Sequence, residues 1–312
     1  MSLRVNSISK RLGNDWILRN VSFSAVSGEI IAVYSDDARS SDSLLRIIAG
    51  SERANGGNAD PETSPPVLIS KQSDAGFDFF GLTIRRSSKR SGSFSPLEAI
   101  KNAKDAGILL IDSPFAARFK TERSRIGDQI TSVAESGSIV IFSTEDFKDA
   151  LEYADRVLVI LHGELEQDAL PQTVYDEPST VAVAKAVGRH NLIEARRLTS
   201  SKNDVPEFVT IEGEHRLFAR PTEKAKLGAI NKNVTLAIRP EQISISFGAS
   251  FPEDNLLKAS VTAIHPMGPT TRVLLDCSGL VLEALVLRVV GLEIGDECMV
   301  GLPPDRIAVL AN

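Results

Sequence analysis

Residues 29–50 read EIIAVYSDDARSSDSLLRIIAG, and this stretch decides how the chain folds. The apolar run at residues 30–34 predicts a buried strand. Apolar residues at helical spacing from Leu44 to Ile48, followed by Gly50, predict a helix that stops at the glycine. The polar residues between these two segments predict a tight loop. A strand, a loop and a helix in this order indicate an α/β domain.

A loop of this kind can hold phosphate groups when glycines aim backbone N–H groups at the phosphate and a lysine neutralises its charge. Anchored on LLRIIAG at residues 44–50, the loop resembles the Walker A segment of ATP-binding subunits of ABC transporters that import sugars, glycerol phosphate and polyamines. The family motif G-P-S-G-C-G-K-S-T falls on residues 35–43. Its positions are replaced here by Ser35, Ala38 and Ser40 for the glycines, Ser41 for the lysine, Asp42 for the Mg²⁺-binding hydroxyl, and Ser43.

The charge of this loop is opposite to the charge that the resemblance implies. Residues 35–43 contain three aspartates and one arginine, a formal charge of −2. One unit-charge contact at a partly exposed site is worth roughly 4 kcal/mol, so the loop opposes a nucleotide triphosphate. A second interpretation is a strand-to-helix turn whose carboxylates cap the helix amides. We therefore expect no ATP or Mg²⁺ cofactor and no other metal.

Length and composition set the remaining bounds. A chain of 312 residues suggests two domains, and 42% apolar residues suffice for a core. The formal charge of −6 argues against a nucleic-acid partner. Cys277 and Cys298 show neither a disulfide framework nor metal-ligand spacing, which indicates a reducing compartment. The sequence has no signal-peptide core and no long apolar run, so we expect a protein that is cytoplasmic or peripheral on the inner face of the membrane.

Two further positions in the first part of the chain can be compared with the family. Residues 3–33 are similar to the opening β-subdomain of the importer ATPases, in which an aromatic residue at the position of Leu12 stacks on adenine. Trp16 lies further along the chain, and we interpret it as a packing residue. Gln72 aligns with the glutamine of the family's Q-loop and is a candidate contact to Mg²⁺ or nucleotide. A surface position in a loop is the other interpretation of Gln72.

The helical subdomain of the family is mostly missing. Its signature L-S-G-G-Q falls near residues 88–92, where only Gly92 fits, and a helix is predicted soon afterwards at residues 96–106. A basic cluster precedes this helix and overlaps the signature position, and we interpret it as a solvated linker, with contact to anionic lipid or a partner as the alternative. The cluster consists of Arg85, Arg86, Lys89 and Arg90.

The residues that the family uses for catalysis are replaced here, as are those of the loop. The segment ILLIDSP at residues 108–114 resembles Walker B, and Asp112 stands where the family aspartate binds the Mg²⁺ shell. Ser113 replaces the glutamate that polarises the attacking water. Glu145 replaces the switch histidine that senses the γ-phosphate. Asp112 and Gln72 therefore remain as candidates for nucleotide chemistry, and no catalytic residue is intact.

The second half of the chain changes to short strands with turns, which predicts a small β-barrel. The segment at residues 153–188 matches the end of the family's ATPase domain. The motif Arg239-Pro240-Glu241 resembles the R-P-E motif of the family's C-terminal TOBE domain. We therefore predict an ABC ATPase-like domain at residues 1–188 and an OB-like TOBE domain at residues 191–312. The four histidines are scattered and receive no role.

The resemblance as a whole implies a P-loop-type α/β domain with a shortened helical subdomain, followed by an OB-like β domain. It implies a subunit of a carbohydrate or glycerol-type ABC importer that has lost its nucleotide chemistry and acts structurally or in regulation. The implied partners are permease subunits, an intact ATPase paralogue, and a second subunit bound through the C-terminal domain. The alternatives are a ligand-sensing regulator that uses the β domain, a weakly active ATPase, and a decaying gene product.

Overall fold

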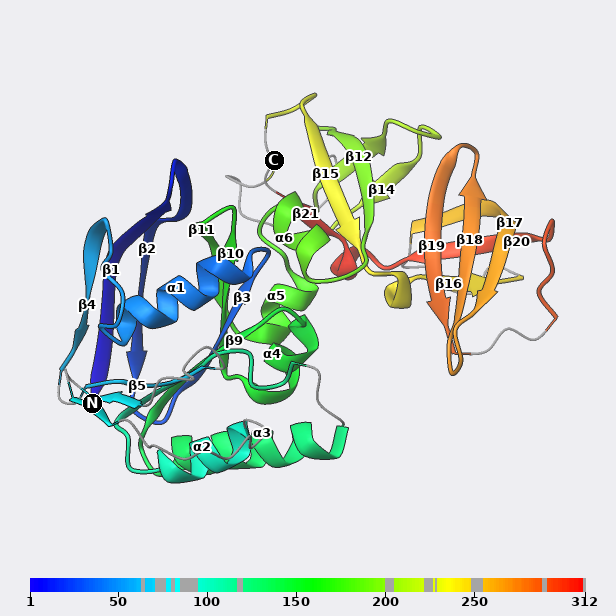
Figure 1. The fold of residues 1–312 in the computed structure, drawn as a ribbon. Coiled ribbons are helices and arrows are strands. Elements are labelled where there is room, and N and C mark those ends of the chain that lie inside the picture. Colours follow the sequence, from blue (N-terminus) through cyan, green and yellow to red (C-terminus); the bar gives the residue numbers. More distant parts are fainter. Residues whose placement is uncertain are drawn as a thin grey trace. The chain divides into compact units, whose positions relative to one another are not determined.

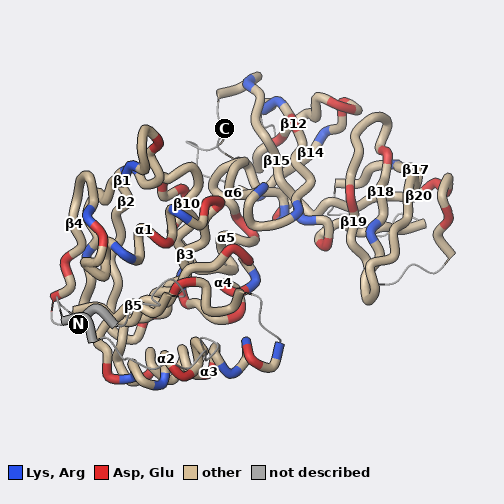
Figure 2. The backbone as a smooth tube through the Cα atoms, viewed as in Figure 1, with Lys and Arg blue, Asp and Glu red and all other residues tan. Residues whose placement is uncertain are grey.

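The computed structural model describes residues 1–62, 65–70, 77–79, 82–84, 95–116, 120–199, 205–221, 227, 229–247, 255–287 and 291–310. The chain divides into two compact units, Met1–Val174 and Tyr175–Asn312 (Figure 1). This division falls within helix α5 (Pro171–Asp176), and the boundary at residue 188 stays a prediction. Acidic and basic residues are interspersed along both units (Figure 2). Among the described residues, no helix is long and apolar enough to cross a membrane.

The first unit is built on a six-stranded sheet with the strand order β11-β10-β3-β9-β8-β5. All neighbouring strands are parallel except the β10–β11 pair. Strand β3 is completely buried, as its apolar sequence predicts, because helices cover both faces of a parallel sheet. The strands are β3 (Ile30–Ser35), β5 (Val67–Ile69), β8 (Ile108–Ile111), β9 (Ile139–Thr144), β10 (Arg156–Leu161) and β11 (Glu164–Ala169).

Helices connect these strands; α2 begins at Pro96 as predicted but ends at Asn102, before the predicted end at residue 106. Helix α1 follows β3 directly and packs Leu44 and Leu45 into the core that it shares with β1, β2 and the parallel sheet. A second, antiparallel sheet has the order β2-β1-β4 and closes the other side of this core. The remaining elements are α1 (Ala38–Ile48), α2 (Pro96–Asn102), α3 (Lys120–Glu135), α4 (Phe147–Tyr153), β1 (Ser2–Leu12), β2 (Asp15–Val26), β4 (Gly56–Pro61), β6 (Phe77–Phe79) and β7 (Leu82–Ile84).

Helices α3 and α4 meet at a glycine. A Cβ atom at Gly127 of α3 would lie 2.2 Å from Cε1 of Tyr153, at the end of α4. The Tyr153 ring stacks on the ring of Phe115 with centroids 4.5 Å apart, so the tyrosine is held in place. Glycine therefore permits the close packing of this helix pair.

The second unit contains two five-stranded antiparallel sheets that share one hydrophobic core. Their orders are β14-β13-β12-β15-β21 and β16-β20-β17-β18-β19. A short helix, α6 (Val181–Ala186), precedes them. The strands are β12 (Asn191–Arg197), β13 (Glu207–Thr210), β14 (Arg216–Phe218), β15 (Asn233–Ile238), β16 (Ser244–Ser246), β17 (Asn255–Pro266), β18 (Thr271–Cys277), β19 (Leu280–Val286), β20 (Glu297–Leu302) and β21 (Ala308–Leu310).

The two sheets are copies of one pattern repeated after 64 residues. Each strand of the first set begins 64 residues before its counterpart: β12 before β17, β13 before β18, β14 before β19, β15 before β20, and β16 before β21. A 3₁₀ turn follows β15 at Pro240–Gln242, and the corresponding turn follows β20 at Pro304–Arg306. Asn191 has its counterpart in Asn255, and Ile245 has its counterpart in Val309. The second unit is therefore an internal duplication.

Each half of the duplication supplies an edge strand to the sheet of the other half. Strand β16 of the first half pairs with β20 of the second half, and β21 of the second half pairs with β15 of the first. The buried amide of Asn191 bonds the backbone N–H and C=O of Glu283 in β19 at 2.7 and 2.8 Å. Asn255 bonds the backbone of Phe218 in β14 in the same way, at 2.7 and 2.9 Å. The predicted fold class, an α/β P-loop-type domain followed by an OB-like β domain, is confirmed.

Candidate functional site

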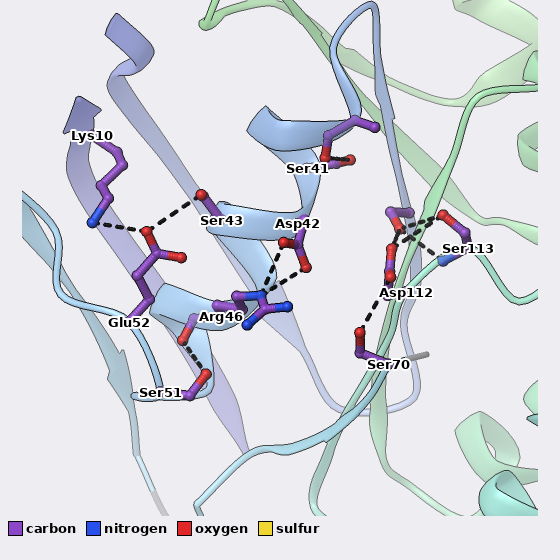
Figure 3. Close-up of polar contacts among 12 residues, drawn as sticks. Lys10, Ser41, Asp42, Ser43, Arg46, Ser51, Glu52, Ser70, Asp112 and Ser113 are labelled. Carbon is purple, nitrogen blue, oxygen red and sulfur yellow. Dashed lines mark hydrogen bonds and ion pairs between the residues drawn. The ribbon is translucent and has the colours of Figure 1, made fainter. Parts of the chain in front are cut away.

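The predicted site residues gather at one edge of the parallel sheet. Strands β3, β9 and β8 are neighbours and parallel, so the segments after their carboxyl ends lie at the same edge. These segments carry the loop at residues 35–43, Glu145, and Asp112 with Ser113. Figure 3 shows Asp42, Arg46, Ser41 and Asp112 at this edge. Gln72, residues 88–92 and the basic residues 85–90 lie outside the described part of the chain.

The loop after β3 bonds to itself. The Asp37 N–H donates to Ser35 Oγ at 3.2 Å, and Ser35 Oγ donates to the Asp37 carbonyl at 3.1 Å. Asp37 caps helix α1: its carboxylate accepts the Arg39 N–H at 2.9 Å, and its carbonyl accepts the Ser40 N–H at 2.9 Å. These three N–H groups belong to the backbone that holds phosphate in a Walker A loop. Here each of them has a partner within the protein.

The charged groups of the loop are paired as well. The Arg39 guanidinium bonds the Asp37 carboxylate at 2.8 Å and holds the pKa of that carboxyl below its usual value. Asp36 accepts the His162 N–H at 3.2 Å, and its carboxylate lies 3.2 Å from His162 Nδ1. Asp42 and Arg46 form an ion pair at 2.9 Å along helix α1, which raises the pKa of the arginine.

The hydroxyls at the start of helix α1 face inward. Ser41, at the lysine position, is buried and donates to the Ala38 carbonyl at 3.1 Å. Ser43 donates to Glu52 at 3.4 Å, and the same carboxylate bonds Lys10 at 2.8 Å (Figure 3). Lys10 belongs to strand β1, and its ion-pair partner Glu52 follows the C-terminal end of helix α1. This cation is therefore held away from the N-terminal end of the helix, where the loop lies.

Asp112 is surrounded by hydroxyls. Its carboxylate accepts hydrogen bonds from Ser143 Oγ at 3.0 Å, Ser113 Oγ at 3.1 Å and Ser70 Oγ at 3.3 Å. The Ser113 N–H donates to Ser143 Oγ at 2.9 Å, and Ser113 adopts a φ of 46°, in the left-handed region. The carboxylate therefore has three donors from the protein, each on a different strand or loop.

The remaining predicted positions contribute no group to this network. Glu145 follows strand β9 and is exposed. Trp16 is covered by the guanidinium of Arg11, whose central carbon lies 4.1 Å from the ring centroid. This contact occupies one face of the indole, and the interpretation of Trp16 as a packing residue stays a prediction. In the described part of the chain, no group of three or more His, Cys, Asp or Glu side chains could hold a metal ion.

Three partners in the site were not predicted from the sequence. Ser70 follows β5 and Ser143 lies near the end of β9, the two strands on either side of β8, and His162 is a turn residue between β10 and β11. A hydroxyl directly after each apolar strand run was the available signal for the two serines. His162 gives no such signal, because its contact with Asp36 depends on the β3–β10 pairing.

These residues do not fit a nucleotide triphosphate with Mg²⁺. The loop N–H groups bond to Ser35 and Asp37, the lysine position holds a buried serine, and the Mg²⁺-binding hydroxyl is replaced by an aspartate paired with Arg46. Asp42 brings a second carboxylate to the site. The carboxylate of Asp112 already accepts hydrogen bonds from three serine hydroxyls.

Comparison with known proteins identifies relatives over almost the full length. A family model described as "TOBE domain" matches residues 236–310. The sulfate/thiosulfate import ATP-binding protein CysA of Salmonella typhimurium is 25% identical over 360 residues, covering 98% of this chain and 94% of that protein. CysA of Yersinia pestis is 27% identical over 318 residues, covering 86% and 84%. CysA 2 of Shewanella oneidensis is 23% identical over 326 residues, covering 88% and 87%.

Solved structures resemble part of the chain. An ATP-binding cassette of an ABC transporter in its ADP conformation aligns with a TM-score of 0.46 at 15% identity, covering 59% of this chain and 99% of that chain. A nucleotide-free ATP-binding cassette from an ABC transporter aligns with a TM-score of 0.45 at 13% identity, covering 55% and 92%.

Proposed function

The chain belongs to the ATP-binding subunits of ABC transporters that carry a C-terminal TOBE domain, and we propose that it serves an importer as a structural or regulatory subunit that neither binds nor hydrolyses ATP. The observation that carries this proposal is the bonding of the loop after β3. The N–H groups of Asp37, Arg39 and Ser40 bond within the protein, at the place where the family binds phosphate. The chain therefore keeps the fold of the family, while its loop no longer offers the backbone N–H groups that bind phosphate.

Electrostatics supports the same proposal. The loop at residues 35–43 has a formal charge of −2, and its one arginine is paired with Asp37. A phosphate group would have to displace these contacts and would then face three carboxylates. Ser113 and Glu145 supply neither the water-polarising carboxylate nor the γ-phosphate sensor of the family. Nothing in these contacts favours the alternative of a weakly active ATPase.

Calorimetry with MgATP tests the proposal. We expect no heat of binding up to millimolar nucleotide, and no rise in melting temperature, because only a ligand that binds the native state stabilises it. The positive control is the CysA protein of Salmonella typhimurium in the same buffer. A micromolar dissociation constant for this chain would refute the proposal.

A designed gain of function provides the matched comparison. The variant restores the family loop through Ser35→Gly, Ala38→Gly, Ser40→Gly, Ser41→Lys and Asp42→Ser. If the loop alone prevents binding, this variant binds MgATP and the parent chain does not. Hydrolysis stays absent, because Ser113 and Glu145 are unchanged.

We propose sulfate or a related oxyanion as the solute of the importer. The relatives named above are sulfate/thiosulfate import proteins. They favour this solute class over the carbohydrate or glycerol class expected from the sequence. Deletion of the gene in its host, followed by uptake of radiolabelled sulfate and of a labelled sugar, tests the choice. Loss of sugar uptake with normal sulfate uptake would restore the earlier expectation.

The partners that we propose are permease subunits at the cytoplasmic face of the membrane and an intact ATPase paralogue. We further propose that subunits associate chiefly through residues 191–312. Light scattering on the full chain, on a chain ending at Gly188 and on the isolated β unit tests this point. A dimeric truncated chain together with a monomeric β unit would place the interface on the first unit instead.

A further inference from the structure

Asn55 and Gly56, just before and at the start of strand β4, form a pair in which a backbone nitrogen can attack the preceding side chain. The reaction is intramolecular, so the two groups are already held close together. Glycine has no Cβ atom to shield its nitrogen or to restrict its dihedral angles. The sequence contains an asparagine followed by glycine once, at residues 55–56, and Asn55 is exposed to water.

The fold does not require glycine at position 56. The φ of Gly56 lies outside the left-handed region, and an added Cβ atom would lie 3.8 Å from Cβ of Ser9, an ordinary van der Waals contact. Gly57 differs, because its φ is 78° and an added Cβ atom would lie 2.3 Å from the carbonyl oxygens of Asn6 and Ser7. The packing of β4 against β1 therefore requires Gly57, whereas alanine can replace Gly56.

Pairing with β1 holds Asn55 in place. Strand β4 lies beside β1 at the edge of the antiparallel sheet (Figure 1). The Asn55 N–H donates to the Ser9 carbonyl at 2.8 Å, and its Oδ1 accepts the Arg11 N–H at 2.8 Å. The ends of exposed strands open locally at a small cost in free energy. These two bonds therefore restrain the carboxamide while β4 is paired and release it when the end of β4 opens.

We propose that Asn55 is a site of spontaneous deamidation and that the pairing of β4 with β1 sets its rate. The Gly56 nitrogen attacks the side-chain carbonyl carbon of Asn55 and forms a C–N bond. The Gly56 N–H proton passes to the leaving amide nitrogen, which departs as ammonia. One water molecule then opens the succinimide at either carbonyl and gives aspartate or isoaspartate. Water is the one co-reactant, and no electrons are transferred.

The isoaspartate product changes the backbone. Its main chain passes through the former side-chain carbonyl carbon, so the chain between residues 55 and 56 is longer by one methylene group. Gly57 packs directly on the β1 backbone, which leaves no room to absorb the extra length. The modified chain therefore loses the bond from Asn55 to Ser9, and the start of β4 detaches. The aspartate product keeps the chain length, and its carboxylate can still accept the Arg11 N–H.

This modification weakens the first unit without involving the loop at residues 35–43. Ala54 and Ala59 lie on either side of the modified bond and pack against the core that contains Leu44 and Leu45 of helix α1. Detachment of β4 removes part of this cover, so the stability of the unit falls as the protein ages. The proposal does not depend on the absence of ATP binding, and its failure would leave the proposed function untouched.

Mass spectrometry of proteolytic fragments tests the proposal on the full chain. The protein is incubated in neutral buffer without urea, in urea below the unfolding transition, and in urea above it. We expect slow conversion of Asn55 in the native protein and faster conversion at each step, because β4 opens more often. Asn58 is the internal reference, since Ala59 follows it and carries a Cβ atom. A native rate equal to the denatured rate would contradict control by strand pairing.

Gly56→Ala is the matched control for the chemistry. It should slow conversion about tenfold and leave the midpoint of urea denaturation unchanged or slightly raised. The comparison in denaturing urea does not depend on how this variant folds. Equal conversion of the parent chain and Gly56→Ala overturns the proposal.

Asn55→Asp separates the added charge from the longer backbone. Hydrogen exchange should show full amide protection in β4 for this variant and reduced protection in the isoaspartate fraction of aged protein. Full protection in that fraction would show that the strand accommodates the extra methylene group and would refute the predicted detachment.

Discussion

Ser41 shows why a single substitution cannot restore nucleotide chemistry. Its buried hydroxyl bonds the Ala38 carbonyl, while the amides around it bond Ser35 and Asp37. A lysine at position 41 adds one charge but frees none of these amides, and Ser113 still lacks a carboxylate. We predict that Ser41→Lys releases no phosphate from ATP above a no-enzyme control. Release above that control by the single variant would contradict this interpretation of the loop.

His190 makes the second unit sensitive to acid. Its pKa falls from 6.5 to about 4 on folding, chiefly through burial and then through Arg239. The unfolded chain therefore binds the proton more readily, so stability is complete above pH 6.5 and declines as the pH falls toward 4. The loss is about 1–2 kcal/mol after allowance for the solvent that reaches the ring.

Urea denaturation between pH 4.5 and 7.5 measures this effect. The variant His190→Gln should lose part of the pH dependence, while His162→Gln should retain all of it, because His162 is 84% exposed. Identical pH profiles for the parent chain and His190→Gln would contradict the assignment.

The sequence predicted which residues follow buried strands but not what those residues contact. The apolar run at residues 30–34 predicted the strand before the loop at residues 35–43, and the apolar run ILLI at residues 108–111 predicted the strand that Asp112 follows. The partners of Asp112 could not be read in the same way. Ser70 and Ser143 reach it from strands 42 and 31 residues away, so the contact depends on strand order rather than on local pattern.

Among the elements, the α3–α4 pair depends on Gly127. An exposed Gly→Ala change in a helix interior stabilises it by about 1 kcal/mol. At position 127 the new Cβ would overlap Tyr153, which is stacked on Phe115. We predict that Gly127→Ala destabilises the protein by about 1–3 kcal/mol through overpacking.

The exposed position Ser124 on the same helix provides the control. Ser124→Ala should leave the midpoint of urea denaturation unchanged or slightly raised. If Gly127→Ala behaves like Ser124→Ala, the ring of Tyr153 can move aside and the packing argument fails.

The strand exchange predicts a crossed pattern of destabilisation. Ile245 of β16 and Val309 of β21 are counterparts in the duplication, yet each pairs with the other half. Val309→Ala should lower amide protection chiefly in β15, and Ile245→Ala chiefly in β20, each at a cost of about 2 kcal/mol. Hydrogen exchange resolved by peptide measures both variants. Loss of protection within the same half for each variant would exclude the exchange.

The duplication itself could not be predicted from composition or hydropathy. The sequence showed short strands with turns, which is correct for these elements, but the identities between the halves are few. The correspondence between Asn191 and Asn255 becomes apparent only in the structure, where their amides bond equivalent edge strands. Strand partners in such a sheet depend on long-range register, whereas periodicity reports only which face of a strand is buried.

At the scale of the molecule, Arg239 determines where the second unit begins. A fragment of residues 175–312 keeps the Tyr175 and Arg189 carbonyls that accept from this arginine, while a fragment of residues 191–312 loses both. We predict that the shorter fragment is less stable by about 3 kcal/mol, because the charged guanidinium loses its hydrogen bonds to both carbonyls and its packing against Tyr175. Urea denaturation of the two purified fragments measures the difference. Equal midpoints would show that the predicted boundary near residue 188 is adequate.

The exchange of β16 and β21 also governs when the protein can finish folding during synthesis. Strands β12 to β15 leave the ribosome early, but the edge strand that completes their sheet consists of Ala308–Leu310, about 70 residues after the end of β15. Until residues 308–310 have been made, β15 presents an open edge to other nascent chains, which is a risk for aggregation. A stop codon just before residue 308 would therefore leave the first half of the unit unfinished, although every residue of that half had been made.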